Sequence, residues 1–180
     1  MTDRQPIPFI GVRIHRNQTP TGRRTSTPAR RAAQYYAYGR DLALEREGKQ
    51  RGLWYGPDGQ IQSHQEVLSW ARQEALSRRY TFEALLSVQQ GALTAADFCQ
   101  AMQQGEAIPD WRLLMHRDTG YRHAHVLFFR DKRLDKGRFL AWQQQVREAL
   151  LQLEKQQLAE QQLQHEAGAG KARGLAVEMA

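Results

Sequence analysis

Apolar residues recur along this chain at two spacings, and each spacing predicts a different kind of element. Short runs that are wholly apolar or alternate with polar residues, as in β-strands, occupy 8–15, 80–87, 111–116 and 123–130. Apolar residues three and four positions apart, as on one face of a helix, follow Thr27, Ser63, Thr94 and Arg138. The chain is therefore expected to alternate strands with helices and to end in a helical segment.

Capping signals indicate where the helices start. Thr27, followed by proline, is expected to begin a helix that carries three tyrosines and runs to about Glu47. Ser63 has Glu66 three residues later, which is the spacing of a capping box. The segment 94–97 is expected to cap a third helix, which reaches Gln104.

The order of these elements predicts an α+β fold, with a central antiparallel sheet flanked by helices and a long C-terminal helix. Residues 1–135 are expected to form one core with a basic N-terminal segment. Residues 136–166 are expected to form a glutamine-rich helix that packs on the core and whose distal half projects, because its apolar stripe fades after Leu153. Residues 167–180 are expected to be a flexible tail.

Composition narrows the class of protein. The 180-residue chain contains no apolar run long enough to span a membrane and no apolar core of a signal peptide. Its single cysteine, Cys99, excludes an intramolecular disulfide and lies in a helical pattern, so it is expected to be a small core residue. These features favour a cytoplasmic protein without a membrane segment.

Charge is concentrated at the N-terminus. The first 40 residues have a net charge of +7, whereas the other 140 balance 18 basic against 18 acidic groups. Such a block is typical of a segment that faces a polyanion, and the planar guanidinium suits phosphate oxygens. The alternative, a disordered basic tail, is less consistent with the strand and helix patterns within this block. Its arginines are Arg4, Arg13, Arg16, Arg23, Arg24, Arg30, Arg31 and Arg40.

Three of the six histidines fall within ten residues. His123 and His125 are two positions apart on a predicted strand, so their side chains share one face, and His116 ends the preceding strand. Three converging imidazoles form a divalent-metal site with open coordination positions. The alternative is a strand with half-buried polar residues. His15 could join the site from the first strand, but a single histidine at a strand end is more often incidental. The remaining two histidines, His64 and His165, are expected on the surface.

Four segments in order resemble a known family over residues 28–130. Segment 32–40 resembles a tyrosine motif, 53–59 a Leu-Tyr-Gly and Asp-Gly motif, 82–87 a strand that ends in serine, and 116–125 a His-x-x-Thr-Gly-x-x-His-x-His motif. Together they resemble the relaxases, the strand-transfer endonucleases of plasmid mobilisation and conjugation. These belong to the superfamily named for its His-hydrophobe-His motif (HUH endonucleases).

The resemblance implies a mechanism and its residues. His116, His123 and His125 would bind Mg²⁺ or Mn²⁺, and a tyrosine would nick one strand at an origin of transfer and stay attached to the 5′ phosphate. Tyr36 is the first choice for this nucleophile and Tyr35 the second, while a third tyrosine, Tyr38, is expected to pack. Ser87 and the arginines are expected to bind single-stranded DNA: Arg23, Arg24, Arg30, Arg31 and Arg40.

Some roles stay open at this level. Asp118 is a candidate catalytic residue that orients a histidine or assists proton transfer, but a turn-capping role is equally consistent. Accessory relaxosome proteins are possible partners. A rolling-circle replication initiator would use the same chemistry, although such proteins usually carry the histidine pair before the tyrosine. A non-catalytic, single-stranded DNA-binding relative of relaxases is the alternative from a different class.

Overall fold

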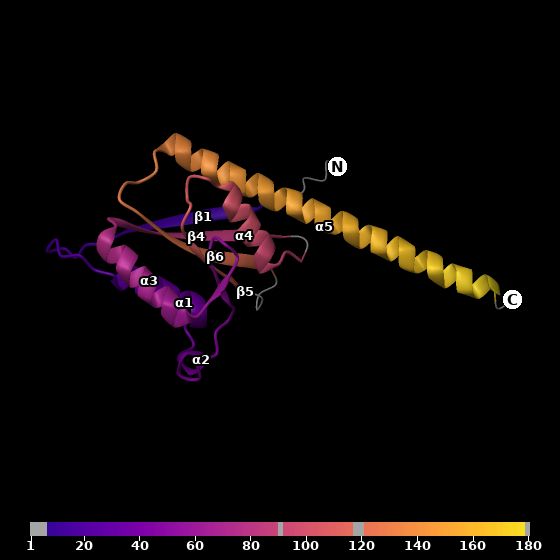
Figure 1. The fold of residues 1–180 in the computed structure, drawn as a ribbon, viewed down its shortest axis with the longest axis horizontal. Helices are drawn as coiled ribbons and strands as arrows, with labels where there is room; N and C mark the ends of the chain where they lie inside the picture. The colour runs from indigo at the N-terminus through magenta and orange to yellow at the C-terminus, as the bar shows by residue number, and fades with distance from the viewer. Residues whose placement is uncertain (1–6, 90–91, 117–120, 179–180) are drawn as a thin grey trace.

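A six-stranded antiparallel sheet forms the centre of the described part of the chain, which covers residues 7–89, 92–116 and 121–178 of a computed structural model (Figure 1). The strand order is β1-β4-β6-β5-β2-β3. The three long strands are neighbours: β1, at one edge, pairs with β4, and β4 pairs with β6. The two short strands β2 and β3 lie at the other edge. Their bounds are β1 (Phe9–Arg16), β2 (Trp54–Tyr55), β3 (Ile61–Gln62), β4 (Tyr80–Val88), β5 (Arg112–His116) and β6 (Arg122–Arg130).

Helices cover both faces of this sheet. On one face α1 packs beside α3, and on the other α4 packs beside α5 (Figure 1). The capping box predicted at the start of α3 is present, and the cap predicted at the start of α4 is also a capping box, formed by Thr94 and Asp97. The α+β class with an antiparallel sheet and a long C-terminal helix is therefore confirmed. The helices are α1 (Thr27–Tyr38), α2 (Leu42–Arg46), α3 (His64–Ser77), α4 (Ala95–Gln104) and α5 (Lys136–Glu178).

Alternation along β4 separates two clusters of buried side chains. Phe82, Ala84 and Leu86 belong to the larger cluster, which α4 and the first half of α5 complete. Residues 81, 83, 85 and 87 point to the opposite face, because successive side chains of a strand alternate. There the smaller cluster contains Leu114 and Leu127 of the sheet together with α1 and α3. Each face therefore has its own apolar core.

The tyrosine helix ends earlier than predicted. The sequence predicts a continuous helix to about Glu47, but α1 ends at Tyr38 and a separate short α2 follows. Gly39 has a φ of +68°, which side chains with a Cβ rarely adopt, and its N–H donates to the carbonyl of Tyr35 at 2.7 Å. Asp41 then caps α2 by accepting a hydrogen bond from the N–H of Ala43. Gly39 therefore ends α1, although the apolar spacing of the flanking residues is typical of a continuous helix.

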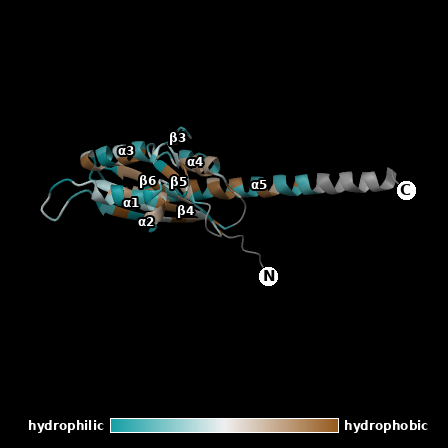
Figure 2. Cartoon of the chain, turned by 90° about the horizontal axis from the view of Figure 1, so that it is seen from below, coloured by the Kyte–Doolittle hydropathy of each residue, from teal (hydrophilic) through white to brown (hydrophobic). Residues whose placement is uncertain are grey.

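The last helix is longer than predicted. It runs for 43 residues, about 64 Å at 1.5 Å per residue, and continues through the segment predicted to be a flexible tail as far as Glu178. In 167–178 four alanines favour the helix and three glycines oppose it, while each added residue contributes one more backbone hydrogen bond. The flexibility expected of this segment stays a prediction. Trp142, Val146 and Leu150 are buried against the sheet. Beyond this part α5 projects from the core, as expected (Figures 1 and 2).

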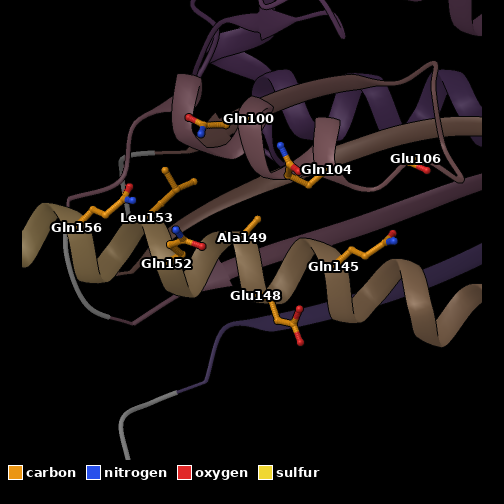
Figure 3. Close-up of a pocket in the computed structure, with 9 residues that line it drawn as sticks. All are labelled: Gln100, Gln104, Glu106, Gln145, Glu148, Ala149, Gln152, Leu153 and Gln156. Atoms are coloured by element: carbon orange, nitrogen blue, oxygen red, sulfur yellow. The ribbon is translucent and has the colours of Figure 1, made fainter.

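A polar groove lies between α4 and α5. Figure 3 shows that it is lined mainly by glutamines, with Glu106 and Glu148 at its sides. The residues that line this groove include no histidine, cysteine or tyrosine. Among the helices in the described ranges, none combines the length and apolar character needed to cross a bilayer.

Candidate metal centre and active site

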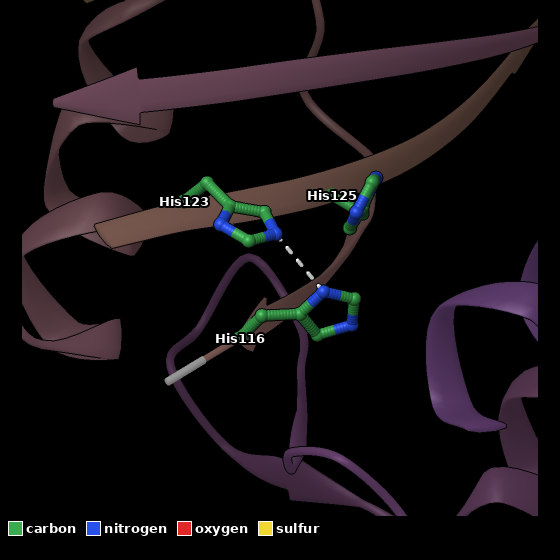
Figure 4. Close-up of side chains that lie close together, drawn as sticks. All are labelled: His116, His123 and His125. Carbon is green, nitrogen blue, oxygen red and sulfur yellow. Dashed lines mark hydrogen bonds between the residues drawn. The ribbon is translucent and has the colours of Figure 1, made fainter. Parts of the chain in front are cut away.

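Strand pairing brings the three predicted histidines together. His116 of β5 lies opposite His123 of β6, and His125 lies two residues further along the same face. One ligand nitrogen from each ring falls within 4.8 Å of the others (Figure 4). The spacing in the sequence thus correctly predicted a cluster that could hold a metal ion.

Backbone carbonyls orient two of these rings. Nε2 of His116 lies 2.7 Å from the carbonyl oxygen of Tyr36, and Nδ1 of His123 lies 3.2 Å from that of Tyr121. Carbonyls only accept, so these two contacts favour a proton on Nε2 of His116 and on Nδ1 of His123 and leave the other nitrogen of each ring to bind a metal ion. Those other two nitrogens lie 3.0 Å apart, at the hydrogen-bond contact drawn in Figure 4. A cation bound by both would replace this contact, since two ligands about 2.1 Å from one ion at a right angle lie about 3.0 Å apart.

His125 is held in its neutral form. Burial lowers its pKa to about 3, and the neighbouring His116, His123 and Arg51 act in the same direction. A neutral imidazole is the form that binds a metal. The ring also stacks on that of Tyr36, with centroids 4.2 Å apart and planes 20° from parallel. The donor set therefore fits a divalent cation.

Tyr36 contacts the histidine cluster with its main-chain carbonyl and with its ring. The side chain is 2% exposed, and its hydroxyl donates to Oε2 of Glu83 at 2.6 Å. Burial, with the adjacent Glu83 carboxylate, raises the pKa of the phenol far above its usual value of 10.0. The phenol is therefore fully protonated at neutral pH, with a carboxylate in position to accept its proton.

Glu83 links the tyrosine to the first strand. Its second oxygen, Oε1, lies 2.6 Å from Nε2 of His15. His15 thus joins the site through Glu83 and not as a ligand of the histidine cluster. Sequence reasoning did not assign Glu83 a role. The signal that could have found it is an acidic residue inside the apolar strand that runs from Phe82 to Leu86.

The other two tyrosines of α1 have different surroundings. Tyr35 is 46% exposed, and its ring meets that of His125 edge to face at 6.5 Å. Tyr38 is buried, and its ring packs edge to face against His64 at 5.2 Å. The expected packing role of Tyr38 is confirmed. The expected surface position of His64 was wrong, because the ring is buried and accepts a hydrogen bond from Nε1 of Trp54 at 3.2 Å.

An open part of the sheet adjoins the cluster. A pocket of about 500 Å³ is lined by residues of β1, of the middle of β4 and of α1. Phe9 is 58% exposed, and its ring lies over Gly11, where an added Cβ would come within 2.9 Å of it. Arg13 is exposed beside them. The pocket is lined by these residues and by Tyr35, Tyr36, Glu83, Leu85 and His125.

The predicted DNA-binding residues lie in three parts of the fold. Ser87 pairs with His123 across the sheet and so shares its face and its end of the strand. Arg23 and Arg24 lie in the loop between β1 and α1, where Arg24 donates to the carbonyl of Arg78 at 3.0 Å. The remaining arginines are exposed on or just after α1, and Arg31 lines a second hollow beside Tyr35: Arg30, Arg31 and Arg40.

Two further predictions concern residues away from the cluster. Asp118 lies outside the described residues, so its role stays a prediction. Cys99 is buried in the larger core, and burial raises the pKa of its thiol to about 12, as expected for a packing residue and not a nucleophile.

Comparison of the chain with models of known protein families, with curated proteins and with solved structures gave no match.

Proposed function

We propose that this protein is a metal-dependent DNA strand-transfer endonuclease of the relaxase type. It would nick one strand at an origin of transfer through Tyr36 and keep the 5′ phosphate as a phosphotyrosine ester. The proposal combines the ordered motifs of the sequence with the geometry around the histidine cluster. Both the enzymatic activity and the relaxase assignment are inferences from these two sources.

One observation carries the proposal: Tyr36 contacts two of the histidines and a carboxylate at once. Its carbonyl orients His116, its ring stacks on His125, and its hydroxyl donates to Glu83. In covalent catalysis a nucleophile is held against a base, and a third group orients that base. Here Tyr36 would be the nucleophile, Glu83 the base and His15 the third group. Tyr35 is exposed and meets the ring of His125 edge to face, so Tyr36 remains the preferred nucleophile.

The residues suggest how the reaction would proceed. Mg²⁺ or Mn²⁺ held by His116, His123 and His125 would polarise a non-bridging oxygen of the scissile phosphate. Glu83 would take the phenolic proton as the oxygen of Tyr36 attacks phosphorus. The bond between tyrosine oxygen and phosphorus forms, the bond from phosphorus to the 3′ oxygen breaks, and that oxygen takes a proton from water. Resealing is the reverse, since the ester retains the energy of the broken bond.

The surrounding surface suits a single strand. Arg13 lies in the pocket beside the reacting groups, and the chain's excess positive charge is confined to its first 40 residues. Phe9 and Tyr35 expose aromatic rings at the same pocket, and unpaired bases stack on such rings without regard to sequence. In a DNA duplex the bases are paired and stacked on one another, so they could not stack on these rings. This favours single-stranded DNA as the substrate.

The test is covalent capture. A pool of labelled, single-stranded oligonucleotides of randomised sequence is incubated with the protein and Mn²⁺, and adducts are isolated under denaturing conditions and mapped by mass spectrometry. We expect an adduct on Tyr36 that requires the metal, is lost in Tyr36→Phe and persists in Tyr35→Phe. An adduct on Tyr35 would reassign the nucleophile, and no adduct at all would remove the enzymatic claim.

A non-catalytic, single-stranded DNA-binding protein is the second candidate. The observation that favours it is the burial of Tyr36, which exposes only 2% of its surface and whose phenol is strongly protonated. In that case the tyrosine would be structural. DNA binding that Tyr36→Phe leaves unchanged, without an adduct in the wild type, would support this candidate.

A further inference from the structure

A second hollow lies beside Tyr35, under the loop that joins β1 to α1. It has a volume of about 580 Å³ and is mostly apolar. Tyr35 and Glu83 line both this hollow and the pocket next to the histidines, so the two spaces meet at these side chains. The loop contributes Thr19 and Thr25, and the start of α1 contributes Thr27.

Hydrogen bonds hold the roof of this hollow in place. The N–H of Thr25 donates to the carbonyl of Asn17 at 3.2 Å, and the N–H of Thr19 donates to that of Arg23 at 2.8 Å. The fully buried Asn17 anchors the loop, because its amide donates to the carbonyl of Arg78 and its side-chain oxygen accepts from Thr81 at 2.6 Å. The hollow is therefore formed before any ligand arrives, which lowers the cost of binding.

The surroundings of the hollow define the chemistry of its occupant. Arg31 lines it, Arg23 lies on the loop above, and the first 40 residues have a net charge of +7. An apolar space in a strongly basic region suits a flat apolar group attached to a negatively charged chain. The ring of Tyr35 supplies a surface on which such a group can stack. A nucleobase on its phosphate backbone has both properties.

We infer that this hollow binds one nucleobase of a single DNA strand, stacked on Tyr35, while the adjoining phosphate lies toward the histidine cluster. The inference rests on the proposed function, from which it takes the substrate class. It assigns the exposed tyrosine a role in binding and leaves the chemistry to Tyr36. It also explains why the two tyrosines are adjacent, since one helix then presents a stacking ring and a nucleophile to neighbouring nucleotides.

Two threonines of this region offer a matched pair of variants. Thr27 lines the hollow and Thr21 does not, although both are exposed. The hydroxyl of Thr27 lies 3.0 Å from that of Thr25, and the hydroxyl of Thr21 lies 2.9 Å from that of Thr19. Thr27→Leu would fill part of the hollow, while Thr21→Leu would remove an equivalent contact outside it. Tyr35→Ala removes the stacking ring.

Binding is measured by fluorescence anisotropy in EDTA with two labelled probes, a 20-mer of thymidine and a fully abasic strand of the same length. We expect the wild type to bind the thymidine strand about tenfold more tightly than the abasic strand. Thr27→Leu and Tyr35→Ala should each reduce this ratio about fivefold, with the abasic affinity unchanged, and Thr21→Leu should keep the ratio.

Equal binding of the two probes by the wild type, or an undiminished ratio in both Thr27→Leu and Tyr35→Ala, would overturn the inference. Tighter binding of a 20-mer of uridine than of thymidine would overturn the assignment to DNA. Because the assay contains no metal and needs no cleavage, it is independent of the adduct experiment. A base preference without adducts would refute the strand-transfer proposal alone, and adducts without a base preference would refute the hollow alone.

Discussion

The two faces of the sheet are built from the same strands, yet they differ in what they bury. Toward α4 and α5 the strands present Phe82, Ala84 and Leu86, and the side chains packed there are almost entirely apolar. Toward α1 and α3 the same strand presents Glu83, and its neighbour β6 presents His123 and His125. One face therefore contributes mainly stability, whereas the other gives up apolar packing to hold groups that can react.

The geometry of a β-strand makes this division possible. Because alternate side chains point in opposite directions, reactive groups at every second position leave the apolar positions between them untouched. His123, Ala124 and His125 show this directly, since the central alanine is fully buried in the larger core. Substitutions on the two faces should accordingly have separable effects.

The largest effect is expected on the apolar face. Phe128 is fully buried and stacks on Phe82 with centroids 4.8 Å apart, so Phe128→Ala should reduce the free energy of unfolding by about 3–5 kcal/mol. Urea unfolding followed by circular dichroism measures this. Leu140→Ala, at a side chain that is 51% exposed on α5, is the control and should stay within about 0.5 kcal/mol of the wild type. Equal losses in the two variants would contradict the assignment of this face as the main core.

The next effect concerns the histidine cluster. His125→Ala should weaken Mn²⁺ binding at least about 100-fold, because two ligands replace three, while the free energy of unfolding measured in EDTA falls by less than in Phe128→Ala. Isothermal titration calorimetry measures the affinity. His165→Ala, on an exposed position of α5, should bind Mn²⁺ as the wild type does. Unchanged affinity in His125→Ala would show that the cluster is not the binding site.

Glu83 tests whether the second face is arranged for proton transfer. Glu83→Gln keeps the size of the side chain but removes the acceptor of the Tyr36 proton, and should slow adduct formation about 100-fold. The affinity for Mn²⁺ should stay within about twofold, since Glu83 is not one of the clustered ligands. Glu160→Gln, an exposed substitution on α5, is the control. Full activity of Glu83→Gln would exclude it as the base.

The smallest effect is a dependence of stability on pH through His64. Burial lowers the pKa of this ring despite the nearby Glu45 carboxylate, so folding favours the neutral form, which accepts from Trp54 and donates to Oε1 of Gln34. The stabilisation is complete above the usual pKa of 6.5 and is lost as the pH falls below it.

Chemical denaturation between pH 8 and pH 5 should therefore show a smaller loss of stability in His64→Gln than in the wild type, and His165→Gln should behave as the wild type does. A wild-type curve that matches that of His64→Gln would show that His64 does not titrate differently in the folded protein.

Most of the fold followed from periodicity, because long strands and amphipathic helices repeat their pattern many times. The short strands Trp54–Tyr55 and Ile61–Gln62 could not be predicted as such, since two residues are too few to show alternation. The break at Gly39 was missed because the apolar spacing continues across it into α2. The full extent of α5 was missed because its distal residues lack an apolar stripe, which is a signal of packing and not of helix formation.

The candidate site was predictable only where spacing alone brings residues together. His123 and His125 needed no more than the strand period, and His116 only a hairpin. The contacts of Glu83 with Tyr36 and His15 join residues 47 and 68 positions away, respectively, through the pairing of β1 with β4 and the packing of α1. No local pattern encodes such contacts. The same reason applies to the buried position of His64 between Trp54 and Gln34.

The hydrogen bond between His116 and residue 36 has a further consequence, because the acceptor is a main-chain carbonyl. Whatever side chain stands at position 36, the peptide group persists and continues to orient the imidazole of His116. Metal binding and tyrosine chemistry can thus be lost independently of each other. A descendant of this chain that had replaced the tyrosine would still hold its ion, so a retained metal site would be no sign of a retained reaction.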